Sequence, residues 1–220
     1  MHELKQVEHI GEGPIADIAR QRIRDEAKTK GMDVLNVTVQ LGRIPDPVIE
    51  ALPEQVRRTI HAVTLGLMDD PAGQLVKIEK LVGNYPHVPL LRNHLGQALA
   101  ASGDYERSER VMAELVQEFP RYVLGLVNYV MILLGGGRLE EARMIMTDGP
   151  TGPLVSLSDV DPTRTEFHIG EAIGMCYLVG NYMLAIGKRE QAKFQLEMLN
   201  QMAPNSPQAL ALAKTLRTRS

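Results

Sequence analysis

Two apolar stripes and one polar break define residues 89–122. From Leu91 to Leu99, apolar side chains recur at about every third or fourth position, which is the period of one face of an α-helix. The sequence Ser102-Gly103-Asp104 interrupts this pattern, and a second stripe runs from Tyr105 to Leu115 before Pro120 ends it. We therefore predict two helices joined by a tight turn.

The same pattern returns when the chain is shifted by 34 residues. Pro86 and Pro120 stand 34 positions apart, and each follows the second helix of a predicted pair. A repeated two-helix unit is therefore the main organising feature of the sequence. Helix pairs are predicted near residues 55–88, 89–122, 123–149 and 164–206, with a terminal capping helix over residues 207–217.

Residues 149–162 break the period between the third and fourth pairs. This segment holds several glycines and prolines and is predicted to be a loop. The 34-residue frame resumes after 16 extra residues, and one long helix is predicted from about residue 164 to residue 186. Loops that interrupt a regular scaffold are frequent sites of function, and a linker without function is the alternative.

The first 45 residues lie outside the repeated pattern and are predicted to form an N-terminal extension to a helical domain over residues 46–220. Residues 14–31 have the pattern of an amphipathic helix. Residues 33–41 alternate apolar and polar side chains, the period-two pattern of a half-buried strand. Since no partner strand is evident, we favour an extended tether for residues 33–41. The alternative is a strand whose free edge recruits another chain.

Composition and charge narrow the function classes. The 220 residues are 44% hydrophobic and 23% charged, which is typical of a globular protein. A net charge of −3 and an aromatic content of 4% argue against nucleic-acid binding, which uses basic surfaces and stacking rings. The longest apolar run, around residues 124–134, is too short to span a bilayer, and the N-terminus lacks an apolar secretory signal. The single cysteine, Cys176, can form no intrachain disulfide, so we expect a cytoplasmic protein without a membrane partner.

The 34-residue period and the helix–turn–helix pattern resemble the tetratricopeptide repeat. The second pair agrees best with the packing positions of that family, at Leu95, Gly96, Leu99, Gly103, Tyr105, Ser108, Met112, Leu115 and Pro120. Corresponding positions recur in the third and fourth pairs, and the first pair is degenerate, so the resemblance covers about residues 54–206. It implies an all-α fold, a right-handed α-solenoid of about four helix pairs with a C-terminal capping helix.

Small residues support this packing on physical grounds alone. They are expected where paired helices come closest, at Gly96, Ala142, Gly180 and Ala192, while large aliphatic side chains fill the remaining space. One helix pair cannot bury its own apolar face, so neighbouring pairs are expected to stack.

The resemblance also implies a ligand site, because ligands of tetratricopeptide repeats usually bind a concave groove lined by the first helix of each pair. The residues at those positions are mostly apolar with several amides: Thr59, Val63, Leu67, Asn93, Gln97, Ala101, Val127, Asn128, Met131, Leu134, Tyr177, Asn181 and Leu184. Chaperone-binding members use Lys and Arg in such positions to clamp a carboxylate, whereas only Asn128 fits that pattern here. We therefore expect an extended apolar peptide or a partner's helix as the ligand. The alternative is that some of these side chains simply pack between neighbouring repeats.

Candidate catalytic and metal-binding residues are few. Glu166, His168 and Glu171 could place two ligands on one face of the predicted long helix, but the spacing gives no third ligand. Cys176 occupies an apolar position, which favours a buried, unreactive thiol. Ser156 lacks a motif that would activate it as a nucleophile. We therefore expect no cofactor and no bound metal.

These observations favour a non-catalytic scaffold or adaptor that binds a protein segment in its groove. One alternative is a self-assembling subunit, a homo-oligomer that associates through residues 33–41 or residues 149–162. The other alternative is a metal-dependent hydrolase that uses Glu166, His168 and Glu171. The sequence does not identify the partner.

Overall fold

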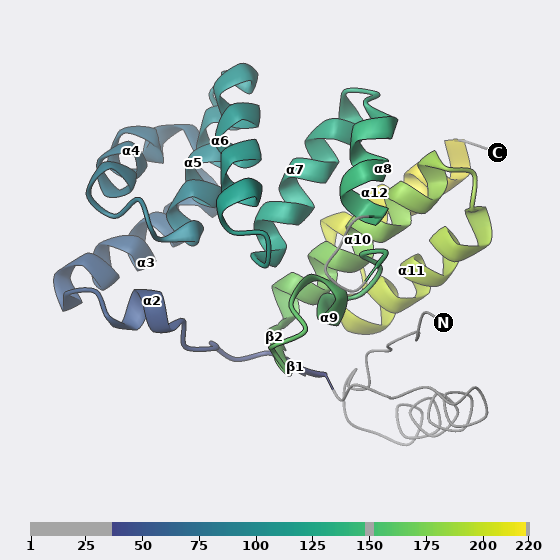
Figure 1. Cartoon of the computed structure of the whole chain (residues 1–220), viewed down its shortest axis with the longest axis horizontal. Helices are drawn as coiled ribbons and strands as arrows, with labels where there is room; N and C mark the ends of the chain where they lie inside the picture. The colour runs from purple at the N-terminus through teal and green to yellow at the C-terminus, as the bar shows by residue number, and fades with distance from the viewer. Residues whose placement is uncertain (1–36, 148–151, 219–220) are drawn as a thin grey trace. The chain divides into compact units, whose positions relative to one another are not determined.

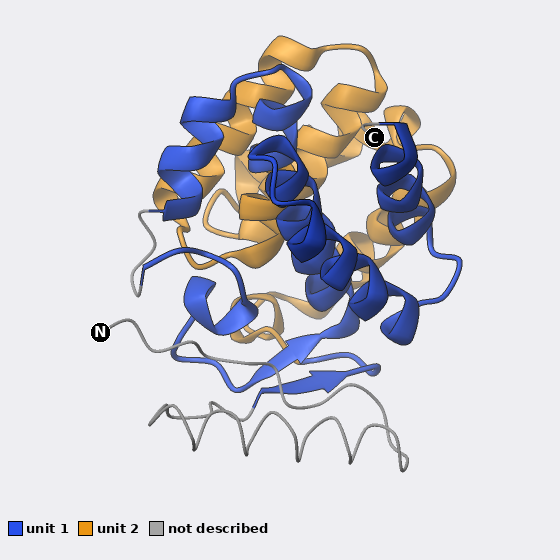
Figure 2. Cartoon of the chain, turned by 90° about the vertical axis from the view of Figure 1, so that its right-hand side faces the viewer, with its two compact units in different colours: residues 1–44, 130–220 blue, residues 45–129 orange. Residues whose placement is uncertain are grey.

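The computed structural model describes residues 37–147 and 152–218. The chain divides into two compact units, one made of residues 45–129 and the other of residues 1–44 and 130–220 (Figure 2). The predicted helix at residues 14–31 lies outside the described residues.

The described chain is mostly α-helical, as predicted (Figure 1). From residue 45 to the unit boundary in α7, the helices are α2 (Pro47–Glu50), α3 (Glu54–Asp69), the 3₁₀ turn η1 (Ala72–Gln74), α4 (Leu75–Asn84), α5 (Pro89–Ala101), α6 (Tyr105–Glu118) and α7 (Val123–Gly135). The elements of the other unit are β1 (Thr38–Gln40), α8 (Leu139–Thr147), α9 (Leu157–Val160), β2 (Glu166–His168), α10 (Ile169–Ala185), α11 (Arg189–Met202) and α12 (Pro207–Thr218). None of these helices is long and apolar enough to cross a membrane.

Three of the turns between paired helices have the same backbone geometry. Each contains a glycine with positive φ, a conformation that glycine adopts without steric cost: Gly103 at 87°, Gly137 at 74° and Gly187 at 76°. The residue after each glycine donates its N–H to a carbonyl five positions earlier, from Asp104 to Leu99 (2.9 Å), Arg138 to Leu133 (2.9 Å) and Lys188 to Met183 (2.7 Å). These bonds define a Schellman helix end. The turn therefore recurs at the 34-residue interval and again after the insertion.

Small residues bring the paired helices close together, as the sequence predicted. A Cβ atom on Gly96 of α5 would lie 2.3 Å from Met112 Cε of α6, and one on Gly180 of α10 would lie 2.5 Å from Leu212 Cδ2 of α12. Ala142 and Ala192 are fully buried near the start of α8 and α11. Ser108 holds the equivalent position in α6, where its hydroxyl donates to the Gly96 carbonyl (2.8 Å).

The predicted capping helix is present as α12. It packs against α10 and α11 through its buried face, on which Ala209, Leu212 and Leu216 lie. Arg189 at the start of α11 donates to the carbonyl of Leu216 (2.5 Å), which satisfies one of the free carbonyls at the end of α12.

In the segment predicted as the loop 149–162, the described residues 152–162 are more ordered than expected. α9 lies within it, and Leu154, Leu157 and Val160 are buried. The N–H of Leu154 donates to the carbonyl of Met146 in α8 (2.8 Å), and α9 packs against α10. α8 ends at Thr147 and has nine residues where α6 has 14. The insertion thus adds apolar side chains next to a shortened helix.

The predicted long helix from residue 164 is wrong at its beginning, because α10 starts at Ile169 and residues 166–168 form β2. β2 pairs in parallel with β1, in the register Thr38↔Glu166, Val39↔Phe167 and Gln40↔His168. The tether favoured for residues 33–41 is therefore wrong for residues 38–40, where the period-two pattern does correspond to a strand.

The close approach at Gly96 leads to a stability prediction. Gly96→Val is expected to lower the free energy of unfolding by about 1–3 kcal/mol, because the added atoms would overlap the Met112 side chain. Gly83 is the matched control, since it also lies in a helix (α4) but has no atom within 4 Å of an added Cβ. Gly83→Ala should raise the free energy of unfolding by about 0.5–1 kcal/mol. Denaturant titration followed by circular dichroism measures both changes, and a Gly96→Val protein of wild-type stability would contradict the close-packing account.

Candidate functional site

The predicted groove residues of residues 45–129 differ in accessibility. Val63 of α3, Asn93 of α5 and Val127 of α7 are buried. Thr59 and Asn128 are half-buried, and Gln97 is exposed. Leu67 is half-buried, and Ala101 is exposed. A ligand could therefore reach five of the predicted residues of this unit (Thr59, Leu67, Gln97, Ala101 and Asn128), while the other three have their side chains in the interior.

The remaining predicted groove residues belong to the other compact unit. Met131 and Leu134 are half-buried on α7, and Tyr177 is half-buried on α10, where Leu184 is buried. The side-chain amide of Asn181 donates to the carbonyl of Tyr177 in the same helix (2.8 Å). One N–H group of the Asn181 side chain is therefore already bonded to the backbone of α10.

Two side-chain hydrogen bonds join consecutive first helices in residues 45–129. The amide of Asn128 in α7 donates to the side-chain oxygen of Asn93 in α5 (2.7 Å). The hydroxyl of Thr64 in α3 lies 2.9 Å from Nε2 of His94 in α5. Neither Thr64 nor His94 is among the predicted site residues. Each bond joins two first helices, so these helices are linked by polar contacts as well as by apolar packing.

Burial of His94 favours the neutral form of its imidazole ring. Its side chain is 6% exposed, and Nδ1 has no hydrogen-bond partner among the described residues. Burial disfavours the charged imidazolium and lowers the pKa of His94 to about 4. At neutral pH the ring is therefore uncharged, and the α5 face that carries it presents neutral hydrogen-bonding groups.

A pocket of about 350 Å³ lies between α3 and the η1–α4 segment. Two predicted groove residues, Thr59 and Val63, line it together with Gln55, Arg58, Ala62, Gln74 and Lys77. Most of these side chains are polar, and two carry positive charge. Arg58 pairs with Glu54, and Lys77 donates weakly to Gln74 (3.4 Å). The pocket therefore combines the side-chain amides of Gln55 and Gln74 with two positively charged side chains, each of which already has a hydrogen-bond acceptor nearby.

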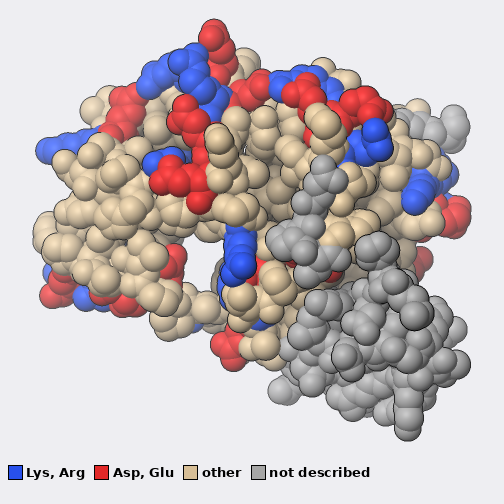
Figure 3. Space-filling model, in the orientation of Figure 1, with Lys and Arg blue, Asp and Glu red and all other residues tan. Residues whose placement is uncertain are grey.

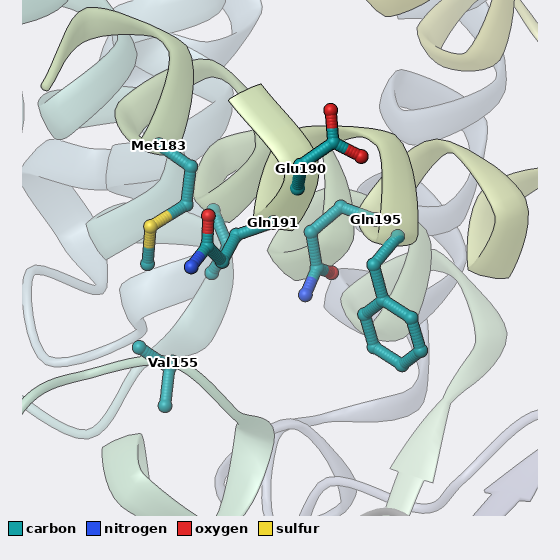
Figure 4. Close-up of a pocket in the computed structure, with 7 residues that line it drawn as sticks. Val155, Met183, Glu190, Gln191 and Gln195 are labelled. Atoms are coloured by element: carbon teal, nitrogen blue, oxygen red, sulfur yellow. The ribbon is translucent and has the colours of Figure 1, made fainter. Parts of the chain in front are cut away.

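A second pocket, of about 420 Å³, lies against the α10–α11 hairpin, and sequence reasoning did not find it. Val179 and Met183 of α10 and Gln191, Phe194 and Gln195 of α11 line it with Glu190 and Val155. Figure 4 shows Val155 on a separate segment of chain opposite the side chains of the hairpin. Val155 belongs to the insertion, so this pocket depends on the part of the chain that departs from the repeat.

Two of the three residues proposed for a metal site, His168 and Glu171, cap the start of α10. His168 is the N-cap, and its Nδ1 accepts the N–H of Gly170 (3.0 Å). Glu171 accepts the N–H of His168 (2.9 Å) and both terminal nitrogens of Arg164 (2.8 and 2.9 Å). Glu166 lies exposed on β2. In the described part of the chain, no three His, Cys, Asp or Glu side chains form a group that could hold a metal ion.

The other candidate nucleophiles are Cys176, which lies on α10, and Ser156, which caps a helix. Burial raises the pKa of the Cys176 thiol to about 12, so the thiol is protonated at neutral pH. Ser156 donates its hydroxyl to Asp159 (2.7 Å), and the two residues form the capping box of α9. Asp161 accepts the N–H and the hydroxyl of Thr163 (3.1 and 2.6 Å).

Charges of both signs lie side by side on the molecular surface. On the face shown in Figure 3, basic and acidic side chains alternate. Exposed ion pairs also lie along the helices, at Glu54–Arg58, Glu106–Arg110 and Glu140–Arg143. Such pairs are typical of solvated helix faces rather than of binding surfaces for polyanions.

Comparison with known proteins gives a distant similarity. No family model matches the chain. It is 24% identical over 159 residues to the aspartyl/asparaginyl beta-hydroxylase of Homo sapiens and 23% identical to that of Mus musculus. These alignments cover 71% of this chain and 20% of each hydroxylase, so the chain spans about a fifth of the length of these relatives.

The buried His94 leads to a pH prediction. Its pKa is about 4 in the folded protein and about 6.5 when unfolded, so the unfolded state binds the proton first as the pH falls. The stabilisation is complete above pH ~6.5 and is lost between pH ~6.5 and ~4, amounting to about 3 kcal/mol. We expect the free energy of unfolding of His94→Gln to fall less steeply over this range than that of the wild type. Urea titrations at several pH values measure the two slopes, and parallel slopes would contradict the assignment.

Proposed function

We propose that this chain is a non-catalytic interaction scaffold of the tetratricopeptide type, with its helix pairs stacked as a right-handed α-solenoid. The observation that carries the proposal is the recurrence of one Schellman turn at Gly103, Gly137 and Gly187. Helix pairs that share the same turn geometry and carry small residues at equivalent positions are expected to form helical hairpins of the same geometry. Hairpins of this kind must stack on one another to bury their apolar faces.

The ligand in this proposal is an extended peptide that lies across the first helices of residues 45–129. Gln97 is exposed on α5, and Thr59 and Asn128 are half-buried on α3 and α7. Side-chain amides both donate and accept hydrogen bonds, so they suit the alternating groups of a peptide backbone. The neutral His94 beside them leaves this surface without an added charge at neutral pH.

The pocket between α3 and the η1–α4 segment provides an anchor for one ligand side chain. Its volume of about 350 Å³ and its lining by Gln55, Gln74 and Lys77 favour a polar or acidic side chain over a bulky apolar one. This modifies the expectation of a wholly apolar ligand, because Thr59, Gln97 and Asn128 are polar and are among the accessible predicted residues.

The distant similarity to aspartyl/asparaginyl beta-hydroxylase is compatible with this proposal. It covers a fifth of those proteins, and so it supports a shared helical segment without carrying the reaction in their name to this chain. A cytoplasmic location completes the proposal, on the ground of the single cysteine.

Selection from a random peptide library on the immobilised full chain tests the proposed function. We expect peptides to be enriched and to bind Gln97→Arg and Thr59→Arg about tenfold more weakly than the wild type, because a long cation would fill the space over α3 and α5. Fluorescence anisotropy measures the dissociation constants. Val127 is unsuitable for this purpose, since it is buried and a charge there would disturb the fold.

Glu114→Arg is the matched control, because Glu114 is exposed on α6, a second helix. It should bind within about twofold of the wild type. Circular dichroism should show that all variants are folded. Failure to enrich any peptide, or equal affinities for all three variants, would overturn the proposal.

A further inference from the structure

The two strands of the small sheet differ in whether their outer edges are open. In the parallel register of β1 and β2, Thr38 and Gln40 direct their backbone groups toward β2, and the N–H of Thr38 donates to the carbonyl of Thr165 (2.8 Å). The backbone N–H and carbonyl of Val39 therefore point away from β2. On β2, the same rule turns the backbone groups of Glu166 and His168 away from β1.

Side chains close the outer edge of β2. Arg164 donates to the carbonyl of Glu166 (3.0 Å), and the N–H of His168 donates to the carboxylate of Glu171 (2.9 Å). Arg164 and Glu171 hold each other through two further bonds, and the guanidinium lies over the Phe167 ring at 4.3 Å. A strand approaching from this side would have to displace an ion pair before it could pair with β2.

The outer edge of β1 has no such closure among the described residues. In that part of the chain the sheet consists of β1 and β2 alone. The two apolar residues that flank β1 differ sharply in burial, since Val37 is buried and Leu41 is 80% exposed. A strand edge without a partner in the described part of the chain, beside an exposed leucine, is a template for pairing with another strand.

From these observations we infer that β1 pairs with β1 of a second copy of this chain, in an antiparallel arrangement that centres on Val39. The sequence around β1, residues 34–41, contains no charge, no proline and no glycine. An antiparallel pair centred on Val39 places Thr38 opposite Gln40 and Val37 opposite Leu41, so no charges of like sign face each other across the two copies. β-branched and apolar residues dominate this segment, which favours strand pairing.

Symmetry also favours a second copy as the occupant. An antiparallel pair of identical strands has two-fold symmetry, and each strand then donates and accepts the same hydrogen bonds. The result would be a four-stranded sheet in the order β2–β1–β1–β2, closed at both outer edges by Arg164 and Glu171. This surface shares no residue with the proposed peptide site, so the two proposals are tested separately.

Sedimentation velocity and light scattering of the full chain, from micromolar to submillimolar concentration, test this inference. The wild type is expected to reach twice its chain mass of 24.4 kDa as the concentration rises. Val39→Pro should remain monomeric, because proline removes an outward N–H and leaves the bond from Thr38 to Thr165 in place. Leu41→Lys should also remain monomeric, because a lysine at the edge of a strand hinders edge-to-edge pairing and would here lie opposite the apolar Val37 of the second copy.

Leu210→Lys is the matched control, since Leu210 is 56% exposed on α12, away from β1 in sequence. It should dimerise like the wild type. A wild type that stays monomeric throughout overturns the inference, and so does a dimer that survives Leu41→Lys or is lost in Leu210→Lys. If Val39→Pro fails to fold by circular dichroism, Leu41→Lys decides the outcome.

Discussion

Paired helices can lie this close together only where one of them carries almost no side chain. Gly96 leaves room for Met112, and its carbonyl accepts the buried hydroxyl of Ser108 (2.8 Å). Gly180 leaves corresponding room for Leu212 of α12. Because interiors are close-packed, a larger side chain at either position would force the facing Met112 or Leu212 side chain to move. The turns depend on the same spacing, since a Schellman end fixes where the next helix begins.

The sequence was a good guide to features that are local. A period of 34 residues, turn glycines such as Gly103 and the mostly helical fold all depend on contacts within one hairpin, so their signals lie close together in the chain. The pairing of β1 with β2 joins residues 38–40 to residues 166–168 across most of the protein. The apolar–polar alternation of a three-residue strand is too short to identify the strand with which it pairs. The sequence around Glu166 and His168 instead predicted the first turn of the helix that follows.

The candidate site was predicted less well, for a physical reason. A helical period shows that a residue belongs to the inner face of a hairpin, but not how far the neighbouring helix covers it. Val63 and Val127 are covered, whereas Gln97 on the same set of first helices is exposed. The contact between Thr64 and His94 arises only when α3 and α5 are in place. Accessibility is thus a property of the packed unit and not of the single helix.

The ion pair between Arg164 and Glu171 stabilises both the start of α10 and the outer edge of β2. Glu171 caps the start of α10 through the N–H of His168, and the Arg164 that pairs with it holds the outward carbonyl of β2. A buried carboxylate is stable only when its acceptor sites are filled, so the helix start and the strand edge require each other. Residues 37–40 complete this arrangement by covering the other edge of β2. Residues 37–40 and the segment from Arg164 to Glu171 therefore form a single structural feature.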